Sequence, residues 1–321
     1  MEPPVPVWGL VDDRTGHTGQ VLGVIGKLGL PFVLKRLSFN WKTFLPLTGV
    51  TLTTLDEAHS APIAPPWPKL VITAGRRTIP IARYIKKKSP STIIVYLMWS
   101  KAAREFDLIA VPNHDDVKAA DNIITTIAPL HAVTPETLAA AKEAWLPKFN
   151  QLPRPWVAVT IGGNTKQRKY RAADWRELIT RAKELAPTGT LMVTTSRRTP
   201  KEALDVITPL LAAGAHILHR WDRDKDNPYL GMLGCADAVI TTGDSLSMCT
   251  EACVSGKPVY VFAPEHVIPK KHARLHQSLY DQLLAKPLDS TSTPEWKPTT
   301  LMDDAGLVAD AIKARFSWIC S

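Results

Sequence analysis

The sequence predicts an α/β protein built from two Rossmann-like, doubly wound domains that face a cleft. Short apolar segments alternate with amphipathic helical segments in the first half of the chain, which is typical of parallel sheets. A proline-rich segment at 150–155 interrupts this alternation, which restarts at Trp156. A length of 321 residues also fits two domains. We therefore expect an N-terminal domain at 1–150, a C-terminal domain at 151–300, and a terminal helix at 301–321 that packs back on the first domain.

The first domain is expected to open with a strand, a glycine-containing loop and a helix, as nucleotide-binding folds do. The loop is predicted at 12–20 and the helix ends near Leu28. A further helix is predicted at 135–145, with Thr134 as its cap. Strands are expected at 5–11, 31–37, 70–73, 92–98, 108–111 and 122–127.

The second domain repeats the alternation of strands and helices. Strands are expected at 156–161, 190–195, 216–218, 236–242 and 259–262, and helices at 174–186, 200–213, 244–255 and 305–316. The helix after the strand at 236–242 is expected to be capped by Asp244, Ser245 and Ser247, and to stop at Gly256.

Charge and hydropathy limit the classes of partner. The formal net charge is +9 and is spread over both halves, so we expect an acidic small-molecule, glycan or membrane partner and no nucleic acid. The densest basic run, residues 83–88, is either a solvated helix end or a membrane-facing patch. No apolar run approaches the roughly 20 residues of a membrane span, and the N-terminus lacks the features of a signal peptide. Four cysteines without a disulfide framework favour a reducing cytoplasm.

Polar loops end three strands of the second predicted sheet. In an open parallel sheet the carboxyl ends of the strands line the ligand crevice, and arginines and helix N-termini there bind phosphate. A carboxylate one to two turns into the following helix could reach a ribose diol. The donor-site candidates are Gly162, Gly163, Asn164, Ser196, Arg197, Arg198, Asp244, Ser245, Ser247 and Glu251. The alternative is an ordinary strand–helix–strand unit with surface arginines.

The loop after the first strand carries the candidates for acid–base chemistry. Asp13 or His17 could take a proton from an acceptor hydroxyl. The alternative is that the aspartates only cap the following helix. Acceptor-binding candidates at the same sheet edge are Arg14, Gly16, Arg76 and Arg77.

Other catalytic motifs are absent from the sequence. It contains no G-x-x-x-x-G-K-[ST] phosphate loop, no G-x-S-x-G elbow and no H-E-x-x-H motif. Cys249 and Cys253 lie one helical turn apart, and we expect them to be small buried residues. His272 and His276 would share a helix face, as surface or core histidines often do. We therefore expect no metal site.

Several long motifs occur together and in one order. They are D-D-R-T-G-H-T-G-Q at 12–20, W-P-K-L-V-I-T-A-G-R-R at 67–77, F-D-L-I-A-V-P-N-H-D at 106–115, I-G-G-N at 161–164, V-T-T-S-R-R-T-P at 193–200, N-P-Y at 227–229 and D-S-L-S-M-C-T-E-A-C-V-S-G-K-P-V at 244–259. On these residues the chain resembles the elongated-mitochondria, or mitochondrial fission, protein family. That family is similar in architecture to GT-B glycosyltransferases.

The resemblance implies that the C-terminal domain binds a nucleotide-diphosphate sugar and the N-terminal domain binds the acceptor. Glu251, before G-K-P, would then contact the ribose. The resemblance also implies metal-independent chemistry, with a helix dipole and arginines in place of a cation and no cofactor besides the nucleotide-sugar co-substrate. The chain departs from the family pattern at Asp12-Asp13, where D-G is usual, and at Trp99-Ser-Lys-Ala-Ala, where a proline-containing polar loop is expected.

The sequence therefore predicts a cytoplasmic glycosyltransferase, free or peripheral on the inner membrane. Its acceptor would be an anionic glycan or glycolipid of the cell envelope, of lipopolysaccharide type. Two alternatives stay open: a nucleotide-sugar epimerase of the same fold, and a non-catalytic membrane-surface adaptor related to organelle fission.

Overall fold

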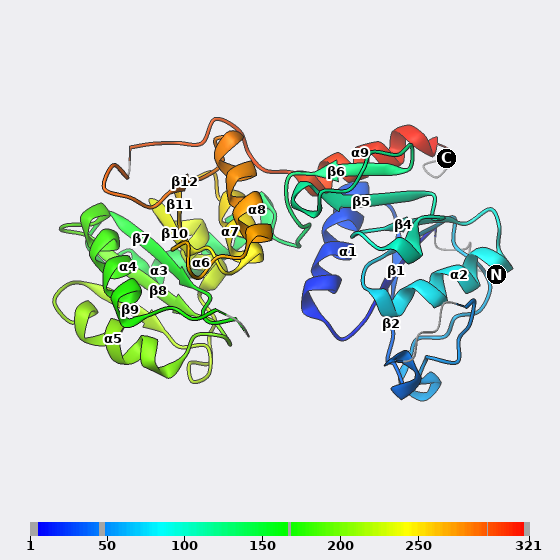
Figure 1. The fold of residues 1–321 in the computed structure, drawn as a ribbon, viewed down its shortest axis with the longest axis horizontal. Coiled ribbons are helices and arrows are strands. Elements are labelled where there is room, and N and C mark those ends of the chain that lie inside the picture. Colours follow the sequence, from blue (N-terminus) through cyan, green and yellow to red (C-terminus); the bar gives the residue numbers. More distant parts are fainter. Residues whose placement is uncertain (1–5, 45–48, 166–167, 294, 318–321) are drawn as a thin grey trace. The chain divides into compact units, whose positions relative to one another are not determined.

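The computed structural model describes residues 6–44, 49–165, 168–293 and 295–317, and it divides into two compact units (Figure 1). The first unit comprises residues 1–132 and 303–321, and the second comprises residues 133–302. Each unit contains a six-stranded parallel sheet with helices packed on it, which confirms the predicted fold class. Val5, which the sequence assigned to the first strand, lies outside the described residues.

The first sheet has the strand order β2-β1-β3-β4-β5-β6. Its direction of winding reverses between β1 and β3, and such a switch point is where open α/β sheets bind ligands. The strands are β1 (Val7–Val11), β2 (Phe32–Arg36), β3 (Leu70–Thr73), β4 (Ile93–Tyr96), β5 (Leu108–Pro112) and β6 (Ile123–Thr126). The helices are α1 (Thr15–Leu28), α2 (Ile79–Lys88) and α9 (Asp304–Arg315), with short 3₁₀ turns η1 (Trp41–Phe44), η2 (Glu57–His59), η3 (Arg76–Thr78), η4 (Lys101–Ala103) and η5 (Asn113–Asp115).

Two apolar layers enclose the first sheet. Alternate strand residues such as Val7 and Ile72 pack under α1 and α9, whereas Leu10 and Val71 pack under α2. Because both faces are covered, the central strands are buried along their whole length. At the central strands, polar side chains therefore gather in the loops at the strand ends.

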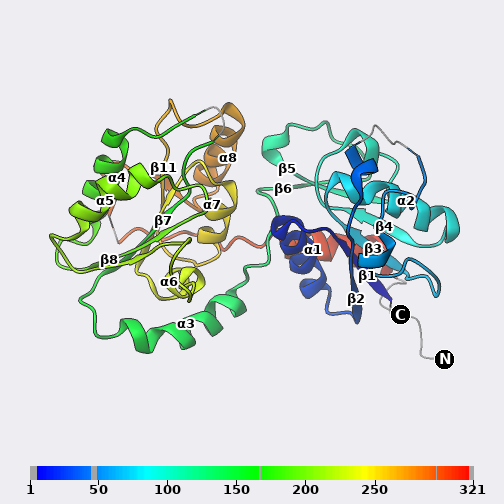
Figure 2. The ribbon, with the colours of Figure 1, turned by 90° about the horizontal axis from the view of Figure 1, so that it is seen from below.

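The second sheet has the strand order β12-β11-β10-β7-β8-β9, and its switch point lies between β7 and β10. Figure 2 shows α4 and α5 beside β8 in this unit. The strands are β7 (Trp156–Ile161), β8 (Thr190–Thr195), β9 (His216–His219), β10 (Ala238–Thr242), β11 (Val259–Phe262) and β12 (Lys286–Pro287). The helices are α3 (Pro135–Phe149), α4 (Ala172–Leu185), α5 (Lys201–Leu211), α6 (Tyr229–Cys235), α7 (Leu246–Cys253) and α8 (Lys270–Asp281).

The predicted domain boundary at residue 150 lies inside the second unit. Helix α3 belongs to that unit because Trp145 packs over Gly231 of α6 and Phe149 packs edge-on against Trp156 of β7. Thr134 caps α3 in a capping box with Thr137. The proline-rich segment that predicted the linker therefore connects two elements of one unit.

The terminal helix α9 lies in the first unit, against α1. The buried carboxylate of Asp304 accepts hydrogen bonds from the backbone N–H groups of Ile127 (3.1 Å) and Ala128 (2.8 Å), and Asp303 pairs with Lys27 at 2.9 Å. The contacts of Asp303 and Asp304, together with apolar packing, thus hold α9 against the first unit. Among the described residues, no helix combines the length and apolar character needed to cross a membrane.

Candidate functional site

Both sheets carry polar loops at their switch points. In the first sheet these are the loops after β1 and β3, and in the second they are the loops after β7 and β10. Because all strands of each sheet are parallel, each pair of loops meets at the carboxyl edge of its own sheet. The two units therefore carry one candidate site each.

Asp12 is the centre of the first site. Its side chain is 1% exposed, and one carboxylate oxygen, Oδ2, accepts from Nε (3.2 Å) and Nη2 (2.8 Å) of Arg77. The other oxygen accepts from the backbone N–H of Arg14 at 3.0 Å and contacts Nδ1 of His17 at 3.0 Å. Burial alone would raise the pKa of Asp12, but these hydrogen bonds and the nearby charge of His17 outweigh it and lower that pKa. Asp12 is therefore held as a carboxylate.

The ring of His17 is fixed from two sides. Asp12 binds Nδ1, and Gly75 lies so close that a Cβ there would stand 2.5 Å from the same nitrogen. Gly75 also has φ +91°, a conformation that favours glycine. Within the described part of the chain, no other group hydrogen-bonds to the ring, whose side chain is 13% exposed. With Nδ1–H donated to the carboxylate, Nε2 carries the lone pair and can accept a proton.

The other first-unit candidates divide into two groups. Asp13 is 76% exposed and pairs with Arg77, so this arginine is tied to both aspartates rather than free. Arg14 and Arg76 are exposed, and Gly16 is exposed with no heavy atom within 4 Å of an added Cβ.

The alternative interpretation of the aspartates as helix caps is wrong, because α1 begins after Arg14 and has no side-chain cap. The sequence placed Asp12 in this loop cluster but did not select it as a site residue, and its place directly after a buried strand was the available signal.

Asp244 organises the second site. Its side chain is fully buried, and its carboxylate accepts from the backbone N–H of Gly163 (2.9 Å) and the hydroxyl of Tyr170 (3.0 Å). Nη2 of Arg198 completes the set at 2.8 Å. Burial raises the pKa of Asp244, and these contacts offset only part of the rise. The expected capping role of Asp244 is therefore wrong, because its carboxylate turns toward other loops.

The three predicted donor loops do meet. Both Ser196 and Thr199 donate hydroxyl hydrogen bonds to the carbonyl of Gly162, and the N–H of Asn164 donates to the carbonyl of Arg198 at 3.2 Å. A Cβ on Gly163, whose φ is +138°, would overlap that same Arg198 carbonyl. These glycines therefore allow the loops to pack against one another, whereas the sequence analysis selected them as donor-site candidates.

The N-terminus of α7 is open. Ser245 stands at the N-cap without a side-chain hydrogen bond, and Ser247 is exposed in the first turn. Asp244, Ser245 and Ser247 were all expected to cap this helix, and no such bond is found among the described residues. The first-turn N–H groups consequently remain available to an anion at the carboxyl edge of β10. Arg197, on the neighbouring loop, is exposed.

Glu251 lies farther along α7 and is held by a residue that the sequence did not select. The hydroxyl of Tyr229, at the start of α6, donates to Oε2 of Glu251 at 2.6 Å. Burial raises the pKa of Glu251, and the Tyr229 hydrogen bond lowers it in part. The signal for Tyr229 was present in the N-P-Y motif at 227–229.

The family assignment follows from the sequence match. Residues 15–316 match the family described as "Mitochondrial fission ELM1". The chain belongs to the mitochondrial fission ELM1 family. A relative from Rickettsia prowazekii (strain Madrid E), "Uncharacterized protein RP120", is 29% identical over 96% of this chain and 97% of its own length. The Arabidopsis thaliana "Mitochondrial fission protein ELM1" is 30% identical over 62% of this chain, and the match spans about half, 52%, of the plant protein.

A solved structure shares the fold of this ELM1-family chain. UDP-GlcNAc 2-epimerase from Neisseria meningitidis, bound to UDP-GlcNAc, aligns over 97% of this chain and 92% of its own with a TM-score of 0.52 and 11% identity. At that identity the likeness shows the fold alone, and it agrees with the predicted pair of Rossmann-like domains.

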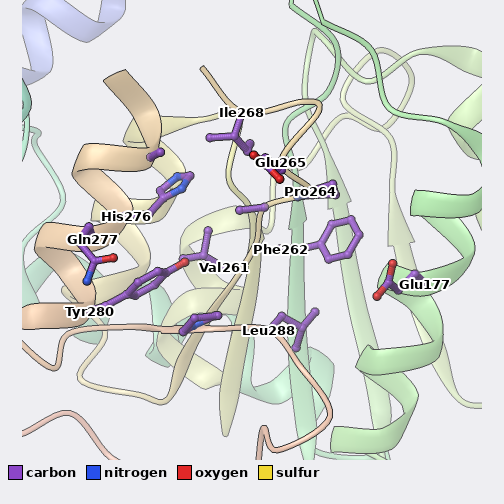
Figure 3. A pocket seen from close by; sticks show the side chains of 13 residues that line it. Glu177, Val261, Phe262, Pro264, Glu265, Ile268, His276, Gln277, Tyr280 and Leu288 are labelled. Carbon is purple, nitrogen blue, oxygen red and sulfur yellow. The ribbon is translucent and has the colours of Figure 1, made fainter. Parts of the chain in front are cut away.

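The second unit of this ELM1-family chain also has an open pocket of about 440 Å³ at the edge of its sheet. Figure 3 shows His276 and Tyr280 of α8 on one side of it and Phe262, Ile268 and Leu288 on the other. None of the ten donor candidates lines this pocket.

His276 and the two cysteines of α7 are core residues. Burial lowers the pKa of His276 to about 4, and its Nε2 lies 4.0 Å from the sulfur of Cys249. Cys249 and Cys253 are buried, as expected. Among the residues that the structure describes, no group of three or more His, Cys, Asp or Glu could hold a metal ion.

Proposed function

We propose that the protein is a glycosyltransferase that moves a sugar from a nucleotide-diphosphate sugar to the hydroxyl of an anionic glycan or glycolipid acceptor. The observation that carries the proposal is His17, whose Nδ1 is bound by the buried carboxylate of Asp12 and whose Nε2 is available. A histidine held in this way is a general base whose positive form is stabilised once it takes a proton. Of the two predicted bases, the geometry favours His17 over the exposed Asp13.

In the proposed reaction, Nε2 of His17 accepts the proton of an acceptor hydroxyl as the oxygen bonds to the anomeric carbon of the donor. The bond from that carbon to the diphosphate oxygen breaks, and its electron pair leaves with the nucleoside diphosphate. The exposed cations Arg14 and Arg76 border His17 on the carboxyl edge of the sheet and suit an acidic acceptor.

The second unit is proposed to bind the donor. The open N-terminus of α7 and the exposed Arg197 would receive the diphosphate, where negative charge grows in the transition state. Arg198 would join them while Asp244 holds its guanidinium, and Glu251, fixed by Tyr229, would bind the ribose. We propose that these groups do the work of a metal ion, and that the reaction needs no cofactor besides the nucleotide-sugar. An acceptor on the inner membrane, reached from the cytoplasm, completes the proposal.

Thermal unfolding in the presence of nucleoside diphosphates and nucleotide-sugars tests the donor site. A ligand that binds only the folded state at about 100 times its Kd stabilises by about 2.7 kcal/mol, which raises the melting temperature by several degrees. Arg197→Ala and Glu251→Ala should each reduce the shift, whereas Arg181→Ala, which removes a solvent-facing pair with Glu184 on α4, should leave it unchanged. An undiminished shift in both site variants would overturn the donor site.

An epimerase is the second candidate, because the fold is shared with a UDP-GlcNAc 2-epimerase. In that case His17 would take the proton of a sugar carbon, and that carbon would regain a proton on its opposite face. Incubation with a nucleotide-sugar and no acceptor separates the two: an epimerised nucleotide-sugar identifies the epimerase, whereas release of nucleoside diphosphate only when acceptor is added identifies the transferase. The exposed cations around His17 favour transfer, since epimerisation needs no acceptor site.

A further inference from the structure

Two aromatic side chains stand out of the first unit. Trp41 is 68% exposed and Phe44 is 82% exposed, and both lie on the short turn η1. This turn follows the end of β2, at the carboxyl edge of the sheet. Side chains of this size are rarely left in water without a binding role when they occur together.

Two exposed cations accompany this turn, one at the end of the preceding strand and one within the turn. Arg36 ends β2 and Lys42 lies between the two aromatics, and both are exposed. Neither makes an ion pair with any residue that the structure describes. The sequence reinforces the point: residues 14–55 contain five Lys and Arg and no Asp or Glu, in a chain with 30 acidic residues among 321. Asp56 lies beside this segment, since its N–H donates to the carbonyl of Ser38, but its carboxylate pairs with His59. The surface therefore combines apolar rings with the positive charge of Arg36 and Lys42.

The basic run that the sequence singled out, residues 83–88, has a different character. Lys86 is bound to Asp107 at 3.0 Å and to the carbonyl of Thr92 at 2.8 Å, and Arg83 is bound to Glu105. Only Lys87 and Lys88 are exposed in this run. They end α2, which starts at the carboxyl edge after β3, so they lie at the opposite edge of the sheet.

We propose that η1 and its cations dock the first unit on an anionic lipid surface. Trp41 and Phe44 would enter the interfacial region of the bilayer, and Arg36 and Lys42 would bind phosphate groups of the lipids. The same sheet edge carries His17, so docking would present the proposed base to hydroxyl groups at the membrane surface. The lipid surface itself does not depend on transfer activity, and only its link to the acceptor rests on the proposed function.

Co-sedimentation of the full-length protein with phosphatidylcholine vesicles, with and without phosphatidylglycerol, tests the proposal. We expect binding to the anionic vesicles only. Trp41→Ser with Phe44→Ser should weaken it by about tenfold or more. Lys42→Glu should also weaken it by about tenfold at low salt, and less as salt rises. Lys87→Glu and Trp221→Ser, which alter exposed side chains elsewhere, are the matched controls and should bind as the wild type does.

Several outcomes would overturn the proposal. They are no sedimentation with either vesicle, equal binding to both, or an equal loss with Lys87→Glu. A wild-type dimer in vesicle-free solution that the double serine variant makes monomeric, without lipid binding, would assign the surface to a second copy of the chain. The aromatics are exposed, so the variants should keep their melting temperature. Intact vesicle binding in a protein without transferase activity would overturn the proposed function and leave the docking surface standing.

Discussion

Each unit buries one aspartate at its switch point and pairs it with an arginine from another loop. In the first unit these are Asp12 and Arg77, and in the second they are Asp244 and Arg198. The two carboxylates nevertheless respond to burial in opposite ways: the pKa of Asp12 is lowered and that of Asp244 is raised. The two aspartate–arginine pairs occupy equivalent positions on similar sheets, but their electrostatic surroundings differ, so we expect them to have different roles.

Burial is the largest influence on the pKa of both carboxylates and raises both, and the two differ in how far their donors outweigh it. Arg77 places two N–H groups on Asp12, which also has the backbone of Arg14 and the ring of His17. Arg198 makes one contact to Asp244, whose other donors are neutral. An ionised Asp12 can stabilise positive charge on His17 during proton transfer, whereas Asp244 holds three loops together. We expect substitutions in the first unit to affect chemistry and those in the second to affect stability and nucleotide binding.

The largest effect is expected from His17→Ala. Loss of a general base should lower turnover by about 10²- to 10⁴-fold, measured as nucleoside diphosphate released from a nucleotide-sugar in the presence of acceptor. The melting shift with nucleotide should persist, because the second unit is intact. His59→Ala is the matched control, since His59 also binds an aspartate, Asp56, at 2.9 Å but is exposed. Equal losses in both variants would remove His17 from the mechanism.

Alanine substitutions at the glycines of the two sites should lower stability by different amounts. Gly163→Ala would drive a Cβ into the backbone of Arg198 at φ +138°, and should reduce the free energy of unfolding by about 3 kcal/mol. Gly75→Ala would push the ring of His17 out of its contact with Asp12, so we expect about 1–2 kcal/mol from strain and a loss of turnover. Gly16→Ala has open space and should change stability by less than about 1 kcal/mol. Denaturant unfolding measures all three, and a Gly163→Ala variant as stable as Gly16→Ala would contradict the packing of the loops.

Much of the architecture could be predicted because buried parallel strands leave a strong local pattern. The strands at 70–73, 156–161, 190–195 and 259–262 have the predicted bounds. The two-residue strand β12 was missed, since so short a segment has no pattern of its own. The domain boundary was misplaced because a proline-rich segment looks like a linker, whereas the stacking of Trp145 and Phe149 on the second unit depends on residues far along the chain.

The sequence predicted which loops come together but not their individual contacts. Polar motifs at strand ends pointed to loops that meet in the structure, since the carboxyl edge of a parallel sheet gathers them. Which aspartate is buried and which is exposed could not be read from Asp12-Asp13, because the choice depends on Arg77, which follows the neighbouring strand β3 and lies 65 residues farther along the chain than Asp12. The contacts of Asp244 could not be predicted either. Its position before α7 is typical of a helix cap, and only the folded structure brings Tyr170 and Arg198 to its carboxylate.

A smaller effect is expected from Tyr229→Phe. The substitution removes one hydrogen bond to Glu251 and nothing else of the side chain, so nucleotide affinity should fall about fivefold. The loss should be greater for a ribonucleotide than for its 2′-deoxy analogue, as titration calorimetry can measure, since Glu251 is proposed to bind the ribose. Tyr280→Phe, in the pocket beside α8, is the control. An equal loss of affinity for the ribonucleotide and its 2′-deoxy analogue would show that Tyr229 supports the fold instead of positioning Glu251.

The smallest effect, and the most direct test of the contrast between the two aspartates, is the pH dependence of stability in Asp12→Asn and Asp244→Asn. Asp12 has a lowered pKa in the folded protein, so its stabilisation is present above the usual value of 3.8 and is lost as the pH falls through the folded pKa. Asp244 has a raised pKa, so ionising it costs stability as the pH rises from 3.8 through its folded pKa. The free energy of unfolding of Asp244→Asn should therefore rise relative to that of the wild type as the pH rises above 3.8. Asp12→Asn should be less stable than the wild type at neutral pH, and this difference should disappear only as the pH falls below 3.8. Denaturant midpoints measured across this range would refute the contrast if the two variants followed the same curve, because both carboxylates would then sit in equivalent electrostatic surroundings.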